Sequence, residues 1–314
     1  MRIVFMGTPE SAIPSLQKLL TGGHEVVAVW TQPDKLAGRG EYLHKPAIKE
    51  FAFDHGLIVE QPAKIKIDQA KDLFASYDAD LAVVVAYGRI LPLEFLRAPR
   101  RGCINVHFSL LPLYRGAAPA NWAIVNGEAK TGVTTMFIEE ELDSGPILLQ
   151  RETEIEETET APELMQRLAV VGADLLSETL AQLDQITPRP QRHQDATLAP
   201  MLTKQHGQID WLNDAVTIER CTRGFQPWPT AYTQHNSRRL IIWKARVAET
   251  GSSDARAGEV GEVIVAHGDD LVVKCGGETA LRLLEVQPEA KRRMSVRDFL
   301  NGKRLKVGDR FGEV

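Results

Sequence analysis

Residues 1–20 read MRIVFMGTPESAIPSLQKLL, and this stretch predicts how the fold begins. Residues 3–6 form a continuous apolar run that ends at Gly7. The following residues have an apolar face at helical spacing, made by Ile13, Leu16, Leu19 and Leu20. A buried strand, a turn and an amphipathic helix in this order are typical of a sheet covered by helices.

The same alternation of strand-like and helix-like segments continues to about residue 187. Apolar runs rich in Val, Ile, Ala and Leu lie at residues 26–30, 57–60, 81–87, 103–106, 131–138 and 147–153. Nearly continuous apolar strands are typical of parallel sheets that are covered on both faces. A helix is expected at residues 162–183, after the capping-box pair Thr160 and Glu163. We therefore expect an α/β domain at residues 1–187, with a Rossmann-like, doubly wound, mostly parallel sheet.

The character of the sequence changes after residue 187. Prolines at 188, 190 and 200 disfavour both helix and central strand, so residues 188–205 are expected to form a linker. Short alternating segments follow at residues 239–247, 259–265, 271–275 and 279–286. Their spacing predicts a small β-barrel within residues 206–314.

The charge is divided unevenly along the chain. The formal net charge is −5, which by itself does not indicate a nucleic-acid-binding protein. Residues 206–314 hold 17 Lys and Arg against 15 Asp and Glu, a net of +2, and the remainder carries −7. This difference in sign favours a polyanionic partner for the C-terminal part.

Cysteine usage and hydropathy exclude several classes of protein. Cys103, Cys221 and Cys275 are odd in number and form no CxxC pair, so neither a structural zinc site nor a disulfide framework is expected. This usage is typical of a reducing cytosol, and we expect a cytoplasmic location. The sequence has no signal-peptide pattern and no run of 18 apolar residues, so no membrane association is predicted.

Three polar residues are candidates for catalysis. The segment INVHFSLLPLYRGAAPANWAI at 104–124 places Asn105 and His107 two apart at the end of a predicted strand, and therefore on one face. Ligands bind at this carboxyl edge in open α/β sheets. Asp143 lies in a predicted turn of GVTTMFIEEELDSGPIL. A carboxylate can orient an imidazole, the imidazole can transfer a proton, and an amide can donate to an oxygen that becomes negative.

Two other interpretations of these residues stay open at this point. His107 can be a satisfied core histidine and Asp143 an ordinary turn residue. A serine nucleophile at Ser109 is disfavoured, because no G-x-S-x-G motif surrounds it.

The string NVHFSLLPLYRGAAP, followed by LDSGPIL, resembles the signature of the 10-formyltetrahydrofolate-dependent formyltransferases. The segment VVVAYGRILP at 83–92 is similar to the folate-pocket segment of that family. The resemblance implies that Asn105 hydrogen-bonds the formyl oxygen, that His107 assists the tetrahedral intermediate and that Asp143 holds His107. Phe108 departs from the pattern, which has glycine there, and is expected to narrow the pocket.

The resemblance also implies a folate site and no metal. Formyl-folate would bind as co-substrate, and its site would be formed by Ser109, Leu110, Leu111, Pro112, Ala86, Tyr87, Gly88, Ile90 and Leu91.

The acceptor of the formyl group is indicated by other segments. MGTPESAIPSL at the N-terminus and RGFQPWPTAY at 223–232 are similar to family members whose acceptor is initiator methionyl-tRNA, and that resemblance implies an OB-like, tRNA-binding C-terminal domain. Basic residues that could reach tRNA phosphates lie in a loop and in the tail: Lys35, Arg39, Lys45, Lys291, Arg292, Arg293, Lys303 and Arg304. Solvated surface charge explains the loop at least as well and is the usual reading of a charged tail, but attachment of this tail to a small β-barrel favours nucleic-acid binding. No coiled-coil pattern is present, which favours a monomer.

Three alternative functions share parts of this pattern. A formyltransferase that acts on a sugar amine or another small amine would use the same three residues without needing the basic tail. Hydrolysis of formyl-folate would use water as the acceptor. A non-catalytic RNA-binding protein would keep the fold but would not need Asn105, His107 and Asp143 together.

Overall fold

The computed structural model describes residues 1–37, 42–249, 258–302 and 305–312. The chain divides into two compact units. The first contains Met1–Pro119, Lys130–Glu154 and Met165–Pro200, and the second contains Ala120–Ala129, Ile155–Leu164 and Met201–Val314. Residues 188–200 of the expected linker thus belong to the first unit. The expected domain ranges of 1–187 and 206–314 stay a prediction, because compactness does not test independent folding.

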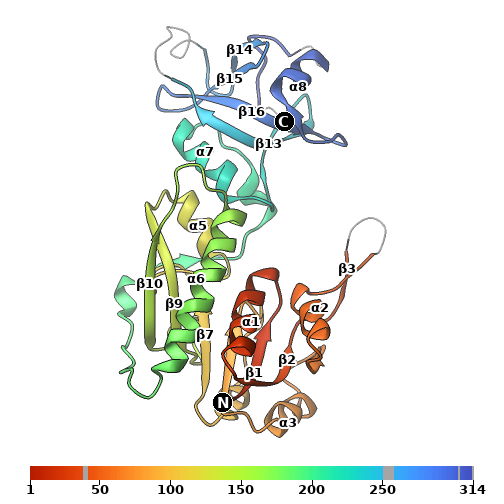
Figure 1. Ribbon diagram of the computed structural model, residues 1–314. Coiled ribbons are helices and arrows are strands. Elements are labelled where there is room, and N and C mark those ends of the chain that lie inside the picture. The colour runs from red at the N-terminus through yellow and green to blue at the C-terminus, as the bar shows by residue number, and fades with distance from the viewer. Residues whose placement is uncertain (38–41, 250–257, 303–304, 313–314) are drawn as a thin grey trace. The chain divides into compact units, whose positions relative to one another are not determined.

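A mixed seven-stranded sheet forms the centre of the first unit (Figure 1). Its strands, in spatial order, are β10 (Ile147–Glu154), β9 (Lys130–Phe137), β7 (Cys103–His107), β6 (Leu81–Val85), β1 (Arg2–Gly7), β2 (Glu25–Trp30) and β5 (Val59–Glu60). Strands β7, β6, β1, β2 and β5 are parallel, and β9 and β10 are antiparallel to their neighbours. The chain moves outward from β1 in both directions, which is the Rossmann-like arrangement expected from the sequence.

Helices connect and cover these strands (Figure 1). They are α1 (Ile13–Thr21), α2 (Ala47–Asp54), α3 (Asp68–Ser76), α4 (Leu93–Arg97) and α6 (Ala161–Ala181), with short 3-10 turns at Glu10–Ala12 and His193–Asp195. Two small pairings complete the unit: β3 (Lys35–Ala37) with β4 (Tyr42–His44), and β8 (Arg115–Gly116) with β11 (Leu198–Ala199). No helix among the described residues has both the length and the apolar character that crossing a bilayer requires.

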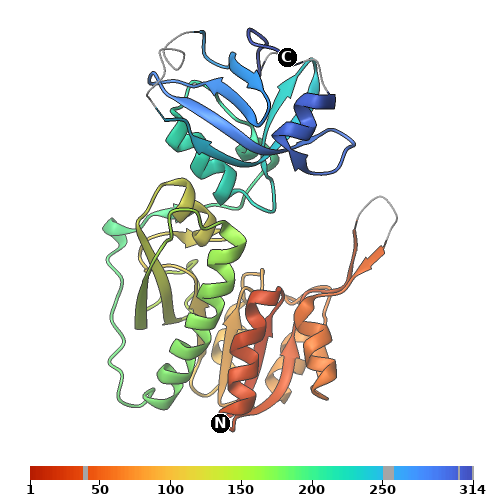
Figure 2. The ribbon, with the colours of Figure 1, turned by 45° about the horizontal axis from the view of Figure 1, so that its top comes forward.

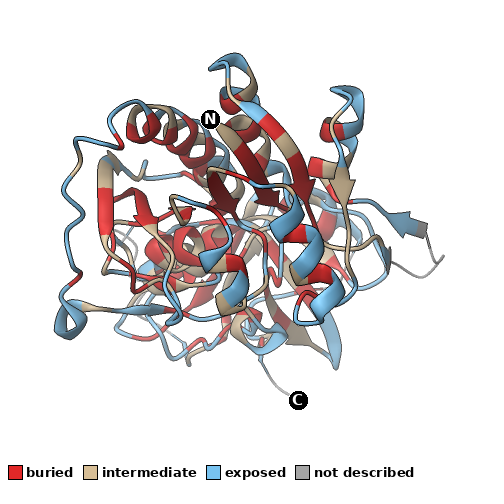
Figure 3. Ribbon diagram, turned by 90° about the horizontal axis from the view of Figure 1, so that it is seen from below, coloured by how far each residue is buried: buried red, intermediate tan, exposed pale blue. Residues whose placement is uncertain are grey.

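Burial follows the apolar runs of the sequence. Every residue of β6 is buried, and the central strands are red along most of their length in Figure 3. Strand β6 ends at Val85, two residues earlier than predicted, because Ala86 has a φ of 48° and Gly88 a φ of 80°. Gly172 allows α6 to lie close to the sheet, since a Cβ there would be 2.9 Å from Val106 Cγ1.

The second unit is built on an antiparallel sheet. Its strands are β12 (Ala231–His235), β13 (Arg238–Val247), β16 (Ala280–Pro288), β15 (Asp270–Lys274) and β14 (Val263–His267), and β17 (Met294–Ser295) pairs with β16. The unit also contains α5 residues from Ala120 onward (helix Pro119–Val125), a 3-10 turn at Lys204–Gly207, α7 (Ala215–Gly224) and α8 (Val296–Gly302). The described strands form an open path from β12 to β14, so the antiparallel sheet is confirmed, and the closed barrel is not found.

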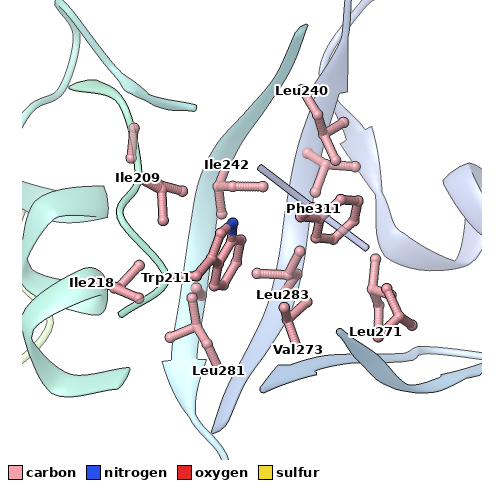
Figure 4. Packing of buried hydrophobic residues seen from close by; sticks show 14 of the residues in the cluster. Ile209, Trp211, Ile218, Leu240, Ile242, Leu271, Val273, Leu281, Leu283 and Phe311 are labelled. Carbon is pink, nitrogen blue, oxygen red and sulfur yellow. The ribbon is translucent and has the colours of Figure 1, made fainter. Parts of the chain in front are cut away.

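The core of this sheet explains its stability (Figure 4). Trp211 and Phe311 stack with ring centroids 5.9 Å apart, and the indole N–H of Trp211 donates to Thr233 Oγ1 at 3.0 Å. Leu271 and Leu283 pack in the same buried cluster. A buried tryptophan whose N–H is hydrogen-bonded buries a large apolar area without an unsatisfied donor.

Candidate active site

Strand β7 carries Asn105 and His107 to the carboxyl edge of the parallel strands. Asn105 pairs in register with Val84 of β6 and Met136 of β9, and His107 pairs with Thr134 of β9. The two side chains lie on one face of β7 because they are two residues apart. His107 is buried, and Asn105 is half-buried. Among the described residues no hydrogen bond of the Asn105 side chain is found, so its amide is available to a substrate.

The imidazole of His107 is held from both sides. Its Nε2 lies 3.0 Å from the carbonyl oxygen of Tyr114, and its Nδ1 lies 3.7 Å from Asp143 Oδ2. A carbonyl oxygen can only accept, so Nε2 carries the proton in this contact. Nδ1 of the neutral ring therefore has a free lone pair that faces the carboxylate. The arrangement can accept a proton at Nδ1 and stabilise the resulting cation.

The carboxylate of Asp143 is fixed by a backbone donor. The N–H of Gly116 donates to Asp143 Oδ2 at 2.8 Å, and Asp143 itself has a φ of 49°. Two residues further on, a Cβ at Gly145 would lie only 2.0 Å from the carbonyl oxygen of Phe137. The turn in the sequence LDSGPIL thus needs glycine at 145 so that the chain can approach β9 closely. The structure brings His107 and Asp143 together as predicted, with Asn105 on the same strand face as His107.

A cavity of about 450 Å³ lies next to Asp143. It is lined by Leu93, Leu96, Ile138, Glu139, Glu140, Glu141, Ser144 and His193. Its volume is in the range of small-molecule sites. Sequence reasoning missed these lining residues. The sequence indicates them only by their proximity to predicted site residues. Leu93 and Leu96 follow the segment at 83–92, and the acidic run at 139–141 precedes Asp143.

The residues predicted for folate flank this cavity in sequence but do not line it. Ala86, Gly88 and Ile90 are exposed, whereas Tyr87 and Leu91 are buried. The Tyr87 carbonyl accepts hydrogen bonds from Thr8 Oγ1 at 3.0 Å and from Gln32 Nε2 at 3.1 Å. Burial raises the pKa of the Tyr87 phenol, which keeps that buried group neutral.

The segment 109–112 is held against β9. Thr134 Oγ1 donates to the Ser109 carbonyl at 2.7 Å and accepts from the Leu111 N–H at 3.1 Å. The Leu111–Pro112 peptide bond is cis, and Leu110 is half-buried. The Ser109 hydroxyl donates to the Leu113 carbonyl at 2.6 Å, which engages the hydroxyl in a backbone contact.

Phe108 does not lie where the sequence suggested. Its ring is buried and is near Gly172 of α6, where an added Cβ would be 3.5 Å from Phe108 Cε1. The side chain alternates with His107 along the chain and packs under the helix on the other face of the sheet. The expectation that Phe108 narrows the pocket is therefore wrong.

The basic residues predicted for tRNA fall into three groups. Lys35 and Lys45 are exposed near the β3–β4 hairpin, and Lys291 and Arg292 are exposed after β16. Arg293 is 2.5 Å from Glu285 Oε2 and lies over the Trp243 ring, 5.0 Å from its centroid. Arg39, Lys303 and Arg304 lie outside the described residues.

Ion pairs reduce the charge that the tail offers to a polyanion. Arg297 pairs with Asp269, and Arg310 pairs with Glu259. Within the described ranges no ion pair is found for Lys291, Arg292 or Lys306. These three residues therefore carry most of the uncompensated positive charge in the described part of residues 291–310.

Known proteins resemble this chain along most of its length. Residues 1–180 match the family described as formyl transferase, and residues 201–304 match the formyl transferase C-terminal domain. The chain is 47% identical to methionyl-tRNA formyltransferase of Caldanaerobacter subterraneus subsp. tengcongensis, over 98% of this chain and 99% of that protein. It is 46% identical to methionyl-tRNA formyltransferase of Methylococcus capsulatus, over 99% and 100%.

Solved structures share the fold at low sequence identity. HypX from Aquifex aeolicus in complex with tetrahydrofolic acid has a TM-score of 0.62 at 18% identity, over 100% of this chain and 51% of that chain. An N-formyltransferase from Helicobacter canadensis, in complex with folinic acid and dTDP-3-aminofucose, has a TM-score of 0.65 at 17% identity, over 90% and 98%. The chain belongs to the formyl transferase family and, within it, to the methionyl-tRNA formyltransferases.

Proposed function

We propose that this protein transfers the formyl group of 10-formyltetrahydrofolate to the α-amino group of the methionine on initiator methionyl-tRNA. The observation that carries the proposal is the His107–Asp143 pair, 3.7 Å apart at the end of β7, together with a cavity of about 450 Å³ that is lined by Glu141 and Ser144 of the turn carrying Asp143. The family to which the chain belongs supports formyl transfer as the reaction.

The three polar residues have distinct roles in this reaction. The neutral amine of methionine attacks the formyl carbon, and the Asn105 amide donates to the carbonyl oxygen as it becomes negative. His107 takes the proton that the amine nitrogen loses, at Nδ1, and the Asp143 carboxylate stabilises the imidazolium. The C–N10 bond then breaks as the carbonyl re-forms. His107 returns its proton to the departing nitrogen, so the reaction needs no net proton from solvent.

The cavity suits the folate ring system. Leu93, Leu96 and Ile138 provide apolar surface for a flat heterocycle, and residues 139–141 provide oxygens that accept from ring N–H groups. We place the pterin there, with the segments 86–91 and 109–112 at its border. The formyl group would then point toward Asp143, which lies between the lining residues Glu141 and Ser144.

We assign tRNA binding mainly to residues 206–314, which we take to be an OB-like domain. The exposed Lys291 and Arg292, with Lys35 and Lys45 of the catalytic unit, would contact backbone phosphates. Arg39, Lys303 and Arg304 are part of the same proposal. The protein would act as a monomer in the cytoplasm, where translation begins.

The test is transfer of a labelled formyl group to separate acceptors. Purified protein is incubated with labelled 10-formyltetrahydrofolate and either charged initiator tRNA, uncharged initiator tRNA, an amino sugar nucleotide or buffer alone. The proposal expects label on the charged tRNA, released with methionine on mild alkaline deacylation. Label on the sugar amine, or free formate at the same rate in buffer alone, would contradict it.

A further inference from the structure

The segment after α6 returns along the edge of the sheet and reaches the active site. In Figure 2 this segment is the green extended run beside β10. Ile147 of β10 and Arg189 exchange backbone hydrogen bonds of 2.8 Å in both directions. Residues 188–199, which we name the strap, therefore lie against the catalytic unit rather than leading directly away from it.

One side chain of the strap is bound to the Asp143 turn. The amide of Gln191, which is 7% exposed, donates from Nε2 to the carbonyl of Asp143 at 2.9 Å and to that of Gly145 at 2.8 Å. Its Oε1 accepts from Arg115 Nε at 3.1 Å and from Nη2 at 2.7 Å. The Gln191 amide thus holds the backbone at Asp143 and Gly145 through its NH₂ group and holds Arg115 through its oxygen.

Arg115 is an unusual partner for this amide. Its guanidinium is buried, and its Nη1 lies 3.4 Å from His193 Nδ1. No carboxylate pairs with it in the part of the chain that the structure describes. A buried cation without a counter-ion is costly, so its position depends on the neutral acceptors of the strap.

The strap also holds the segment that contacts His107. The Tyr114 N–H donates to Thr197 Oγ1 at 2.8 Å, and the Arg115 N–H donates to the Thr197 carbonyl at 2.9 Å. Gly116 can approach Ala199 only because it has no side chain, since a Cβ there would lie 2.5 Å from the Ala199 carbonyl. The segment held in this way provides the Tyr114 carbonyl for His107 Nε2 and the Gly116 N–H for Asp143.

We propose that residues 188–199 position both members of the catalytic pair, with Gln191 fixing the Asp143 turn and Thr197 fixing the backbone that orients His107. Gln191 and Thr197 are positioning residues, because neither contacts the reacting atoms. This inference rests on the proposed function only for its kinetic readout. A displacement of about 1 Å in such a pair is enough to lower the rate of chemistry by up to about 100-fold.

The first experiment compares Gln191→Met with Gln191→Glu in the full-length protein. Methionine has a similar length but provides neither donor nor a strong acceptor, and glutamate restores only the acceptor for Arg115. We expect kcat to fall about 10- to 100-fold in both variants, with KM for formyl donor and tRNA changed by less than about threefold. Gln185→Met, at an exposed position in the turn after α6 and outside the strap, is the matched control and is expected to keep the wild-type kcat. Wild-type kcat in Gln191→Glu would overturn the role of the donor to Asp143 and Gly145.

A second pair of variants covers the case in which Gln191→Met does not fold. Thr197→Val removes the acceptor for the Tyr114 N–H at an exposed position, and Thr197→Ser keeps it. Loss of kcat in Thr197→Val with recovery in Thr197→Ser supports the strap. Equal kcat in both variants and in wild type contradicts it.

A spectroscopic readout separates this inference from the proposed acceptor. The ¹³Cε1–H NMR signal of His107, assigned by its loss in His107→Ala, is followed in each variant without substrates. We expect it to move in Gln191→Met and Thr197→Val and to stay in place in Gln185→Met and Thr197→Ser. An unmoved signal in the first two overturns the strap even if transfer to tRNA is confirmed. A moved signal supports the strap even if wild-type protein transfers no formyl group to tRNA.

Discussion

The Nδ1 of His107 faces Oδ2 of Asp143 at 3.7 Å, while its Nε2 donates to the Tyr114 carbonyl at 3.0 Å. The separation is longer than a hydrogen bond, so the attraction is mainly Coulombic and arises when the ring becomes charged. The pair therefore favours the imidazolium that forms during proton transfer, and the charge on Asp143 should matter more than its ability to accept a hydrogen bond.

Asp143→Asn tests that charge directly. The amide oxygen can still accept from the Gly116 N–H, so the turn should keep its stability, but the imidazolium loses its counter-ion. We expect kcat to fall roughly 10²- to 10³-fold, measured as single-turnover formyl transfer. Asp72→Asn, at an exposed position on α3, is the control and should keep full activity. Activity of Asp143→Asn within a few-fold of wild type would show that the negative charge is not needed.

Gly145 tests the close approach of the Asp143 turn to β9. An added methyl group would lie 2.0 Å from the Phe137 carbonyl, so Gly145→Ala must displace the backbone. We expect a loss of about 1–3 kcal/mol in the free energy of unfolding, measured with urea. Gly302→Ala, where no atom lies within 4 Å of the added Cβ, should change it by less than about 1 kcal/mol. Equal stabilities of the two variants would contradict the packing described for the turn.

The three cysteines predict how stability depends on alkaline pH. Burial raises the pKa of Cys103 and of Cys275 to about 12, and that of Cys221 to about 11. The unfolded chain releases these protons near pH ~8.5, and the folded chain keeps them. Their contribution to stability is complete below about pH 8.5 and is lost as the pH rises toward 11–12.

Urea unfolding at pH 8 and pH 10 measures this loss. Each of the buried thiols Cys103 and Cys275 should contribute up to about 1.4 kcal/mol per pH unit. A variant with all three cysteines changed to alanine keeps the titrations of Lys and Tyr, so its stability should fall less between the two pH values. An equal fall in both proteins would show that the thiols ionise as readily in the folded state.

Much of the fold follows from the sequence, because strand runs such as 81–85 are buried on both faces and need continuous apolar residues. The approach of His107 to Asp143 was expected from the motif, but strand order does not explain it. Strand β9 is antiparallel to β7 and its end at Phe137 pairs with Ile104, so the turn that carries Asp143 begins beside the start of β7 and must fold back to reach His107. The contact of Gln191 with Asp143 could not be predicted. A neutral amide 48 residues away carries no motif, and its burial depends on the path of the whole segment after α6.

The same limit applies to charge and to side-chain direction. The tail is rich in Lys and Arg, but the charge of Arg297 is compensated by Asp269, which lies 28 residues earlier in the chain. The side chain of Phe108 points toward α6, which lies close to the sheet at Gly172. This direction cannot be read from the family pattern alone.

Salt dependence tests the proposed tRNA surface. Lys291 and Arg292 are exposed, so each phosphate contact that they make should add about 1 to the slope of log Kd against log salt concentration. Lys291→Ala and Arg292→Ala should each lower that slope by about 1, and the exposed control Lys66→Ala should not. Arg293→Ala is expected to have a smaller effect, because Glu285 already compensates its charge. Unchanged slopes in the first two variants would remove these residues from the interface.

The most direct test of the account is the single-turnover rate of formyl transfer to charged initiator tRNA in Asn105→Ala and His107→Ala, with both substrates saturating. Asn213→Ala and His267→Ala, which change the same residue types at exposed positions, are the matched controls. The account predicts a fall of about 10²-fold or more in each active-site variant, with substrate binding and the control rates unchanged. Wild-type rates in Asn105→Ala and His107→Ala would contradict it.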